Sequence, residues 1–328
     1  MHPRLTLARN RHRLAGNRGR LIGALLAAGA VAGCGSASAA PSASSTSSTS
    51  SAAGGRIVAV GAENEYANVI SQIGGKYVSA SAIMSNPNTD PHTFEASPSV
   101  AKVVSVAKLV VQNGVGYDTF MNKIESASSN PSRKVIDVQT LLGLPESTRN
   151  PHLWYDPTTM PKVAAALVKD LSALAPSHAS YFAANAKHFD ASLQPWLNAI
   201  AAFKGQHPGT PVATTEPVGD YMLVAAGTNN LTPWNLQADI MNGVDPAPQD
   251  ISLQDNLFKD HKVKVFLYNQ QVTDTLTQSF LAEAAKYHVP VVGVYETMPT
   301  GYSYQSWMLA EVDALNRAVT TGRSTTKL

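Results

Sequence analysis

The sequence lacks several features on which common classes of protein depend. Its 328 residues include a single cysteine, which excludes an intramolecular disulfide and every cysteine-rich metal site. It contains no Gly-x-Ser-x-Gly, no His-Glu-x-x-His and no Gly-x-x-x-x-Gly-Lys-Ser/Thr motif. These absences argue against the commonest hydrolases and against enzymes that use nucleotides.

Positive charge is also scarce once the amino terminus is set aside. The formal net charge is +2, but residues 1–33 contain six arginines and no acidic residue. The remaining 295 residues carry 19 Lys and Arg against 23 Asp and Glu. A body without excess positive charge has little to attract a phosphate backbone, so we do not expect nucleic acid as a partner.

The amino terminus has the order of a secretory signal, with charge first and an apolar segment second. Arginines between Arg4 and Arg20 precede an apolar run at 21–32, which is too short to span a hydrocarbon core of ~30 Å. The run ends in Val-Ala-Gly followed by Cys34, and this resembles the lipobox of bacterial lipoproteins. We therefore predict a signal peptide at 1–33 and an acylated Cys34; an ordinary signal followed by a chance cysteine is the alternative.

A low-complexity segment follows this cysteine. Residues 35–55 consist only of Gly, Ser, Ala, Pro and Thr, which cannot bury enough apolar surface to offset the entropy of ordering. We interpret 34–55 as a lipidated cysteine and a flexible tether. No later segment reaches 18 consecutive apolar residues, so the body itself is not expected to cross a membrane.

From Arg56 the pattern becomes an alternation of strands and helices. Short β-branched runs at 56–62, 77–84, 108–114 and 134–138 alternate with segments of helical periodicity. Strand signals vanish between 159 and 205, where two helices are expected, the second long and kinked at Pro195. Strands return at 210–216, 263–268 and 289–295, before a final helix at about 304–320.

This order predicts an α/β protein with two lobes, each a small parallel sheet covered by helices, joined by a long backbone helix. The expected boundaries are 56–175 for the N-terminal lobe, 176–205 for the linking helix and 206–328 for the C-terminal lobe.

Two loops present a histidine directly after a proline. Asp90-Pro91-His92 follows the second strand, and Asn150-Pro151-His152 precedes the first central helix. Proline restricts the backbone before each imidazole, and neutral imidazole is the commonest side-chain ligand for transition metals. His92 and His152 are therefore candidate metal ligands, although a hydrogen-bonded loop histidine remains the alternative for each.

Four segments together resemble the metal-binding receptors of bacterial ABC importers, the zinc and manganese solute-binding lipoproteins with a long helical backbone. They are EYANVISQIGGKY, the run from DPHTFEASPSV to NGVGYD, the segment from NPHLWYDP to ANAKHF, and GYSYQSWMLAEVDALNRAV. The resemblance extends from about Arg56 to Val319. It implies a monomeric extracytoplasmic receptor, anchored to the membrane by lipid, that delivers a divalent metal to an ABC permease.

The resemblance also implies a ligand set. His92 and His152 are its first two members, and Glu216, five residues before Tyr221, is the third. Glu296 stands where the family ordinarily has an aspartate. Glu216 could instead cap the helix that follows it, and Glu296 could be an exposed loop acid.

Two imidazoles and two carboxylates provide between four and six donor atoms, which suits Mn²⁺ or Zn²⁺ as bound cargo. The ligand types favour manganese slightly, whereas the Irving–Williams order favours zinc on affinity alone. We expect no enzyme activity, because four convergent protein ligands indicate capture rather than an open catalytic position. The alternatives are a metal-containing surface lipoprotein that acts as an adhesin or binds a partner protein, and a mononuclear metallohydrolase.

Overall fold

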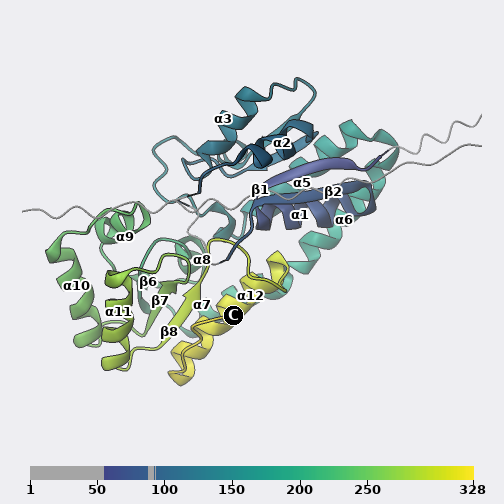
Figure 1. Ribbon diagram of the computed structural model, residues 1–328. Helices are drawn as coiled ribbons and strands as arrows, with labels where there is room; N and C mark the ends of the chain where they lie inside the picture. Colours follow the sequence, from purple (N-terminus) through teal and green to yellow (C-terminus); the bar gives the residue numbers. More distant parts are fainter. Residues whose placement is uncertain (1–54, 88–91, 93) are drawn as a thin grey trace, which may run out of the picture. The chain divides into compact units, whose positions relative to one another are not determined.

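Two four-stranded sheets form the framework of the body, and both are parallel, as the alternating pattern predicts (Figure 1). The computed structural model describes residues 55–87, 92 and 94–328. In the first sheet the order is β2-β1-β3-β4, with β1 at Ile57–Glu63, β2 at Val78–Met84, β3 at Leu109–Gln112 and β4 at Lys134–Asp137. In the second it is β6-β5-β7-β8, with β5 at Pro211–Thr214, β6 at Asn229–Asn230, β7 at Val265–Asn269 and β8 at Val291–Val294.

Helices cover both sheets. Those of the first half are α1 (Asn64–Gly74), α2 (Pro98–Val106), α3 (Thr119–Ala127), α4 (Val138–Leu142), α5 (Thr159–Leu174) and α6 (Ala179–Ser192). Those of the second half are α7 (Gln194–Gln206), α8 (Asp220–Ala225), α9 (Trp234–Met241), α10 (Pro248–Lys259), α11 (Thr275–Lys286) and α12 (Tyr304–Thr321). The predicted fold class is confirmed. Three elements of the structure, α4, β6 and α9, were not predicted.

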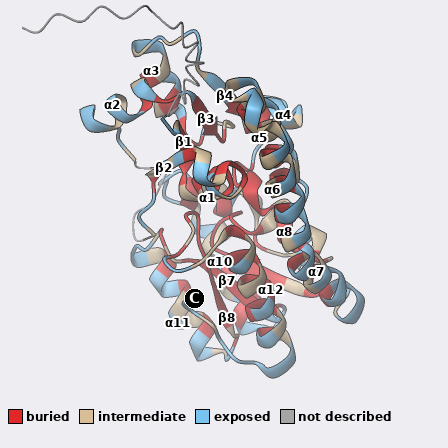
Figure 2. Cartoon of the chain, turned by 90° about the vertical axis from the view of Figure 1, so that its right-hand side faces the viewer, coloured by how far each residue is buried: buried red, intermediate tan, exposed pale blue. Residues whose placement is uncertain are grey.

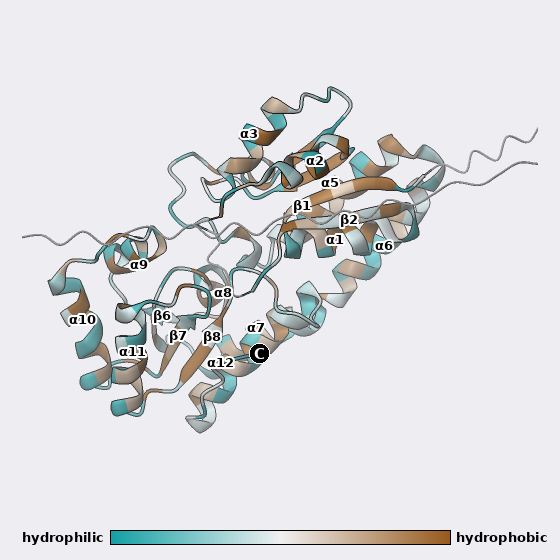
Figure 3. Cartoon of the chain, in the orientation of Figure 1, coloured by the Kyte–Doolittle hydropathy of each residue, from teal (hydrophilic) through white to brown (hydrophobic). Residues whose placement is uncertain are grey.

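Several strands are apolar because both of their faces are covered. Every residue of β3, β7 and β8 is buried, as in parallel sheets covered by helices, whereas the edge strands β2, β4 and β6 are partly exposed. Figure 2 shows the strands in red and the outer faces of the helices in pale blue, and Figure 3 shows the same contrast in hydropathy. One apolar cluster joins the two halves and contains the fully buried rings of Trp154, Trp196 and Trp307. The described body is accordingly a single compact unit.

The predicted linking helix is present as two consecutive helices. α6 ends at Ser192 and α7 begins at Gln194, so the interruption falls at Leu193. Pro195 lies in the first turn of α7, where its missing N–H leaves no hydrogen bond to residue 191. The predicted disturbance near Pro195 is therefore confirmed, whereas the exact limits of the two lobes stay a prediction.

Side chains of α1 hold the segment that follows β8. Asn64 donates to the carbonyl oxygen of Met298 at 2.8 Å and accepts from the backbone nitrogen of Met298 at 2.8 Å. One turn later, Asn68 accepts from the backbone nitrogen of Tyr304 at 3.1 Å. A helix of the first half thus fixes the backbone of a segment from the second half.

The predicted signal peptide, Cys34 and all of the tether except residue 55 lie outside the described residues. Among the residues that are described, no helix combines the length and the apolar character needed to cross a membrane.

Candidate metal centre

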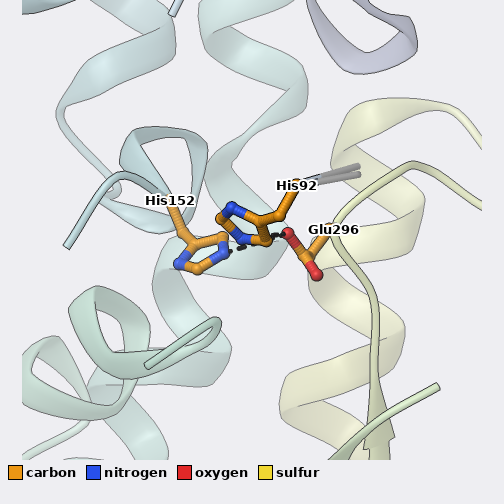
Figure 4. A group of neighbouring side chains, drawn as sticks. All are labelled: His92, His152 and Glu296. Atoms are coloured by element: carbon orange, nitrogen blue, oxygen red, sulfur yellow. Dashed lines mark hydrogen bonds and ion pairs between the residues drawn. The ribbon is translucent and has the colours of Figure 1, made fainter. Parts of the chain in front are cut away.

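Three of the four predicted ligands lie together where the carboxyl ends of the strands meet. One possible ligand atom from each of His92, His152 and Glu296 lies within 4.8 Å of the other two (Figure 4). His92 belongs to the segment after β2, His152 precedes the short 3-10 helix Leu153–Tyr155, and Glu296 follows β8. Open parallel sheets commonly bind ligands at this edge. Within the described residues, no other group of three such side chains meets the same distance limit.

Asn150 determines which ring nitrogen of His152 carries the proton. The amide nitrogen of Asn150 donates to the carbonyl oxygen of Pro217 at 2.8 Å, so Oδ1 faces His152. This oxygen can only accept, and it lies 3.0 Å from the backbone nitrogen and 2.8 Å from Nδ1 of His152. Nδ1 is therefore the protonated nitrogen, and Nε2 presents a lone pair.

The lone pair of His152 faces an ionised carboxylate. Burial lowers the pKa of His152 more than the neighbouring Glu296 raises it, so the ring is neutral at pH 7. Burial alone would raise the pKa of Glu296, but the neighbouring His92 imidazole lowers it well below its usual range. Two acceptor atoms, Nε2 of His152 and Oε2 of Glu296, thus lie 3.2 Å apart, an arrangement that a cation between them would stabilise.

The spacing of the three donor atoms suits a small divalent ion. A tetrahedral ion with bonds of about 2.1 Å holds its ligand atoms about 3.4 Å apart. Oε2 of Glu296 lies 3.1 Å from Nε2 of His92 and 3.2 Å from Nε2 of His152. The group therefore has the donor types of such a site, and two of its three donor distances are close to the expected spacing.

His92 is the member of the group that solvent can reach. Its side chain is 17% exposed, whereas those of His152 and Glu296 are fully buried. It lines a pocket of about 540 Å³ together with Phe94, Tyr117 and other residues of the first half. An ion that enters from this pocket meets His92 first.

Glu216 is buried but does not lie within the group of three. Instead, it is joined to the group through Asn269, the last residue of β7. The Asn269 amide donates to Oε1 of Glu296 at 2.7 Å and to Oε1 of Glu216 at 3.0 Å. The structure thus brings Glu216 next to the candidate centre through a shared hydrogen-bond donor.

Four residues that the sequence analysis did not single out hold the predicted ligands. Tyr117 donates to Oε2 of Glu296 at 3.0 Å, and Gln271 accepts from the backbone nitrogen of Glu296 at 2.6 Å. Asn150 orients His152, and Asn269 contacts both carboxylates. The only signal in the sequence was their position relative to the strands. Asn269 ends an apolar strand, Gln271 lies two residues after it, and Tyr117 lies in the turn after another strand.

A buried chain of hydrogen bonds also joins the segment of His152 to that of Glu296. Nε1 of Trp307 donates to Oε1 of Glu311 at 2.6 Å, and the same oxygen lies 2.9 Å from the hydroxyl of Tyr155. That hydroxyl lies 2.8 Å from the carbonyl oxygen of Tyr295. Burial raises the pKa of Glu311 to about 8, so its carboxyl is largely protonated at neutral pH.

Comparison with known proteins assigns the chain to a family. The sequence profile of zinc-uptake complex component A, periplasmic (ZnuA), matches residues 60–318. The chain belongs to this family. The match includes both histidine-containing loops and both sheets, and it confirms the resemblance found in the sequence. The ZnuA family is one of periplasmic components, which agrees with a location outside the cytoplasm.

The individual proteins to which this chain is similar are distant from it in sequence. A suspected metal-binding protein of Thermotoga maritima is 32% identical over 94 residues, which is 29% of this chain and only 33% of that protein. FpvC of Pseudomonas aeruginosa, solved with Ni²⁺, superposes with a TM-score of 0.66 at 21% identity and covers 82% of this chain and 99% of its own. The periplasmic zinc-binding protein TroA of Treponema pallidum gives 0.68 at 18% identity and covers 82% of this chain and all of its own. The two-lobe fold is therefore shared with both solved proteins.

Proposed function

We propose that this protein is an extracytoplasmic receptor that captures a divalent transition metal, Mn²⁺ or Zn²⁺, and delivers it to a membrane ABC permease. The observation that carries the proposal is the unprotonated Nε2 of His152, which faces an ionised carboxylate at 3.2 Å beside a second imidazole. We propose His92, His152 and Glu296 as ligands, with Glu216 as the fourth once an ion draws it in.

Capture fits this arrangement better than catalysis. A catalytic metal site keeps one position open for water and places a general base beside it. Here the side chains of His152 and Glu296 are fully buried, and the remaining access runs along His92. FpvC has been solved in complex with Ni²⁺ and with Mn²⁺, and TroA is a zinc-binding protein. These relatives support a transition metal as the cargo.

The direct test is metal analysis of the protein purified without added metal, followed by competition between Mn²⁺ and Zn²⁺. A wild-type protein that binds neither ion below millimolar concentration would exclude the proposal.

Replacing Glu296 by glutamine should weaken metal binding more than tenfold, because the amide removes a charge and a good oxygen ligand. The free energy of unfolding of the metal-free protein should change by less than ~1 kcal/mol, since the new amide can donate to Nε2 of His152. Calorimetric titration measures the affinity. Glu63→Gln is the matched control, because Glu63 is another fully buried glutamate outside the group of three, and burial and nearby acids raise its pKa. Equal affinities for Glu296→Gln and the wild type would remove Glu296 from the ligand set.

We also propose that Cys34 anchors the receptor to the outer face of the cell membrane through an acyl chain. Its support is the small-residue motif before Cys34 and the tether after it. Cys34→Ala should move the protein from the membrane fraction to the soluble extracytoplasmic fraction, as followed by fractionation and by mass spectrometry of the mature amino terminus. A wild-type protein that begins elsewhere and carries no lipid would contradict this.

A further inference from the structure

Asn269 lies between the two carboxylates of the candidate centre and is fully buried at the end of β7. Its orientation is determined by its surroundings. Its Oδ1 accepts from the backbone nitrogen of Gln271 at 3.0 Å, so the amide nitrogen must face the opposite way, toward Glu216 and Glu296. Its own backbone nitrogen donates to Oγ1 of Thr215 at 3.0 Å, which holds the residue in place.

The amide nitrogen has two hydrogens, and each is used on a different carboxylate. One hydrogen bond reaches Oε1 of Glu296 at 2.7 Å and the other reaches Oε1 of Glu216 at 3.0 Å. A neutral donor between two carboxylates reduces their mutual repulsion. It also forms a hydrogen bond with one oxygen of each carboxylate, Oε1 in both cases.

The other oxygen of Glu296 faces the histidines. Oε2 lies 3.1 Å from Nε2 of His92 and 3.2 Å from Nε2 of His152, on the side away from the oxygen bound to Asn269. An ion placed among the imidazoles therefore meets a carboxylate whose second oxygen is already hydrogen-bonded. An oxygen that already accepts a hydrogen bond is a weaker ligand for a metal, so binding through both oxygens would compete with this 2.7 Å hydrogen bond.

From this geometry we propose that Asn269 makes Glu296 and Glu216 one-oxygen ligands and thereby selects for ions of low coordination number. This inference rests on the proposed metal-capture function and identifies the residue that sets its selectivity between metal ions. Two nitrogens and two oxygens complete the tetrahedral shell that Zn²⁺ adopts, whereas Mn²⁺ prefers a larger shell rich in oxygen, which two-oxygen carboxylates would supply. Asn269 is a positioning residue, because it touches the ligands and not the ion. The ligand types alone had favoured manganese slightly, and the hydrogen bonds of Asn269 favour the opposite choice.

The first test needs no substitution. X-ray absorption spectroscopy of the zinc-loaded wild-type protein should show about four nitrogen and oxygen neighbours at about 2.0–2.1 Å. A shell of five or more, with a second carboxylate oxygen bound to the ion, would overturn the proposal.

The second test measures the ratio of the dissociation constants for Mn²⁺ and Zn²⁺. Asn269→Leu has a similar size but no donor, so both carboxylates gain freedom to bind through two oxygens. The ratio should fall at least tenfold in favour of Mn²⁺. Asn269→Ala, which is smaller and also lacks a donor, serves if the leucine variant does not fold. Gln254→Leu is the matched control, because it removes another fully buried amide of the same half, whose nitrogen donates to the carbonyl oxygen of Thr214.

The outcomes separate the two proposals. A ratio within twofold of wild type in the Asn269 variants, with both ions still bound, overturns the role of Asn269 and leaves metal capture intact. A wild-type protein that binds neither ion overturns metal capture and this inference with it. An equal fall of the ratio in Gln254→Leu would attribute the effect to general loosening of the lobe and would also overturn the proposal.

Discussion

Saturation with Zn²⁺ is expected to raise the free energy of unfolding by about 4 kcal/mol when free ion is a thousandfold above its dissociation constant. The reason is that the proposed ligands are far apart in the sequence, with His92 and His152 in the first half and Glu296 in the second. An unfolded chain cannot bring them together, so the ion binds only the folded state. Stability should then increase by about 1.4 kcal/mol for each further tenfold rise in free ion.

Urea unfolding at several buffered concentrations of free zinc measures this dependence. The matched comparison is His152→Ala, which removes a fully buried ligand and should abolish the dependence on zinc. A double variant that lacks both His92 and His152 yet shows the same zinc-dependent gain would place the ion elsewhere on the chain.

The second large effect is expected from Glu311→Gln and depends on pH. The pKa of Glu311 is raised to about 8 in the folded protein, mainly by burial, from an ordinary value of about 4.5. Because the folded state favours the protonated carboxyl, the stability that Glu311 contributes is fully present below pH 4.5 and is lost as the pH rises toward 8. A difference of about 3.5 pKa units corresponds to ~4–5 kcal/mol. Glutamine remains neutral throughout, so this loss should be absent from the variant.

The geometry explains why the folded state needs this proton. The hydroxyl of Tyr155 has one hydrogen but lies near two acceptors, the carbonyl oxygen of Tyr295 at 2.8 Å and Oε1 of Glu311 at 2.9 Å. A single hydrogen is shared between these two acceptors, so Tyr155 compensates a negative charge on Glu311 only in part. Nε1 of Trp307 and the backbone of Tyr295 also favour the ionised form, but together these groups do not offset the cost of burial.

The measurement is the difference in unfolding free energy between Glu311→Gln and wild type, both metal-free in chelator, from pH 4.5 to 9. This difference should shift by ~4 kcal/mol in favour of the variant across that range. Any pH-independent cost of the substitution cancels when the differences at two pH values are compared. The titration of other buried acids, such as Asp118, whose pKa burial raises to about 6, also cancels because both proteins contain them. A difference that does not vary with pH would mean that Glu311 is ionised in the folded protein.

Much of the fold could be predicted because its elements are long or strongly patterned. Apolar runs such as 263–268 and periodic segments such as 304–320 correspond to β7 and α12 with small shifts at their ends. The missed elements are short: β6 has two residues, and α9 has eight residues directly after Pro233. Strands of that length carry no periodicity, and they form because neighbouring strands supply the hydrogen bonds.

The candidate centre was predicted only in part, because some of its residues carry a local signal in the sequence and others are placed by the fold. The proline before His92 and before His152 is a local signal, whereas the distance of Glu216 from the group depends on how β5, β7 and β8 are placed side by side. The roles of Asn150 and Asn269 were not predictable, because an amide becomes a proton-orienting or carboxylate-orienting group only through its tertiary partners. Glu296 has one more methylene group than the aspartate that the resemblance led us to expect at this position. In the structure its carboxylate lies at hydrogen-bonding distance from both imidazoles.

The hydrogen bonds of Asn64 and Asn68 with the segment after β8 limit how the two halves could be exchanged between related proteins. Glu296 belongs to the second sheet by chain connectivity, yet the backbone that follows it is paired with the amide groups of α1. The unit that must be transplanted together to keep these contacts is therefore larger than one lobe. A chimera that joined the second half of this receptor to the first half of a relative would separate Met298 and Tyr304 from their partners, so the functional boundary of the metal centre crosses the structural boundary between the sheets.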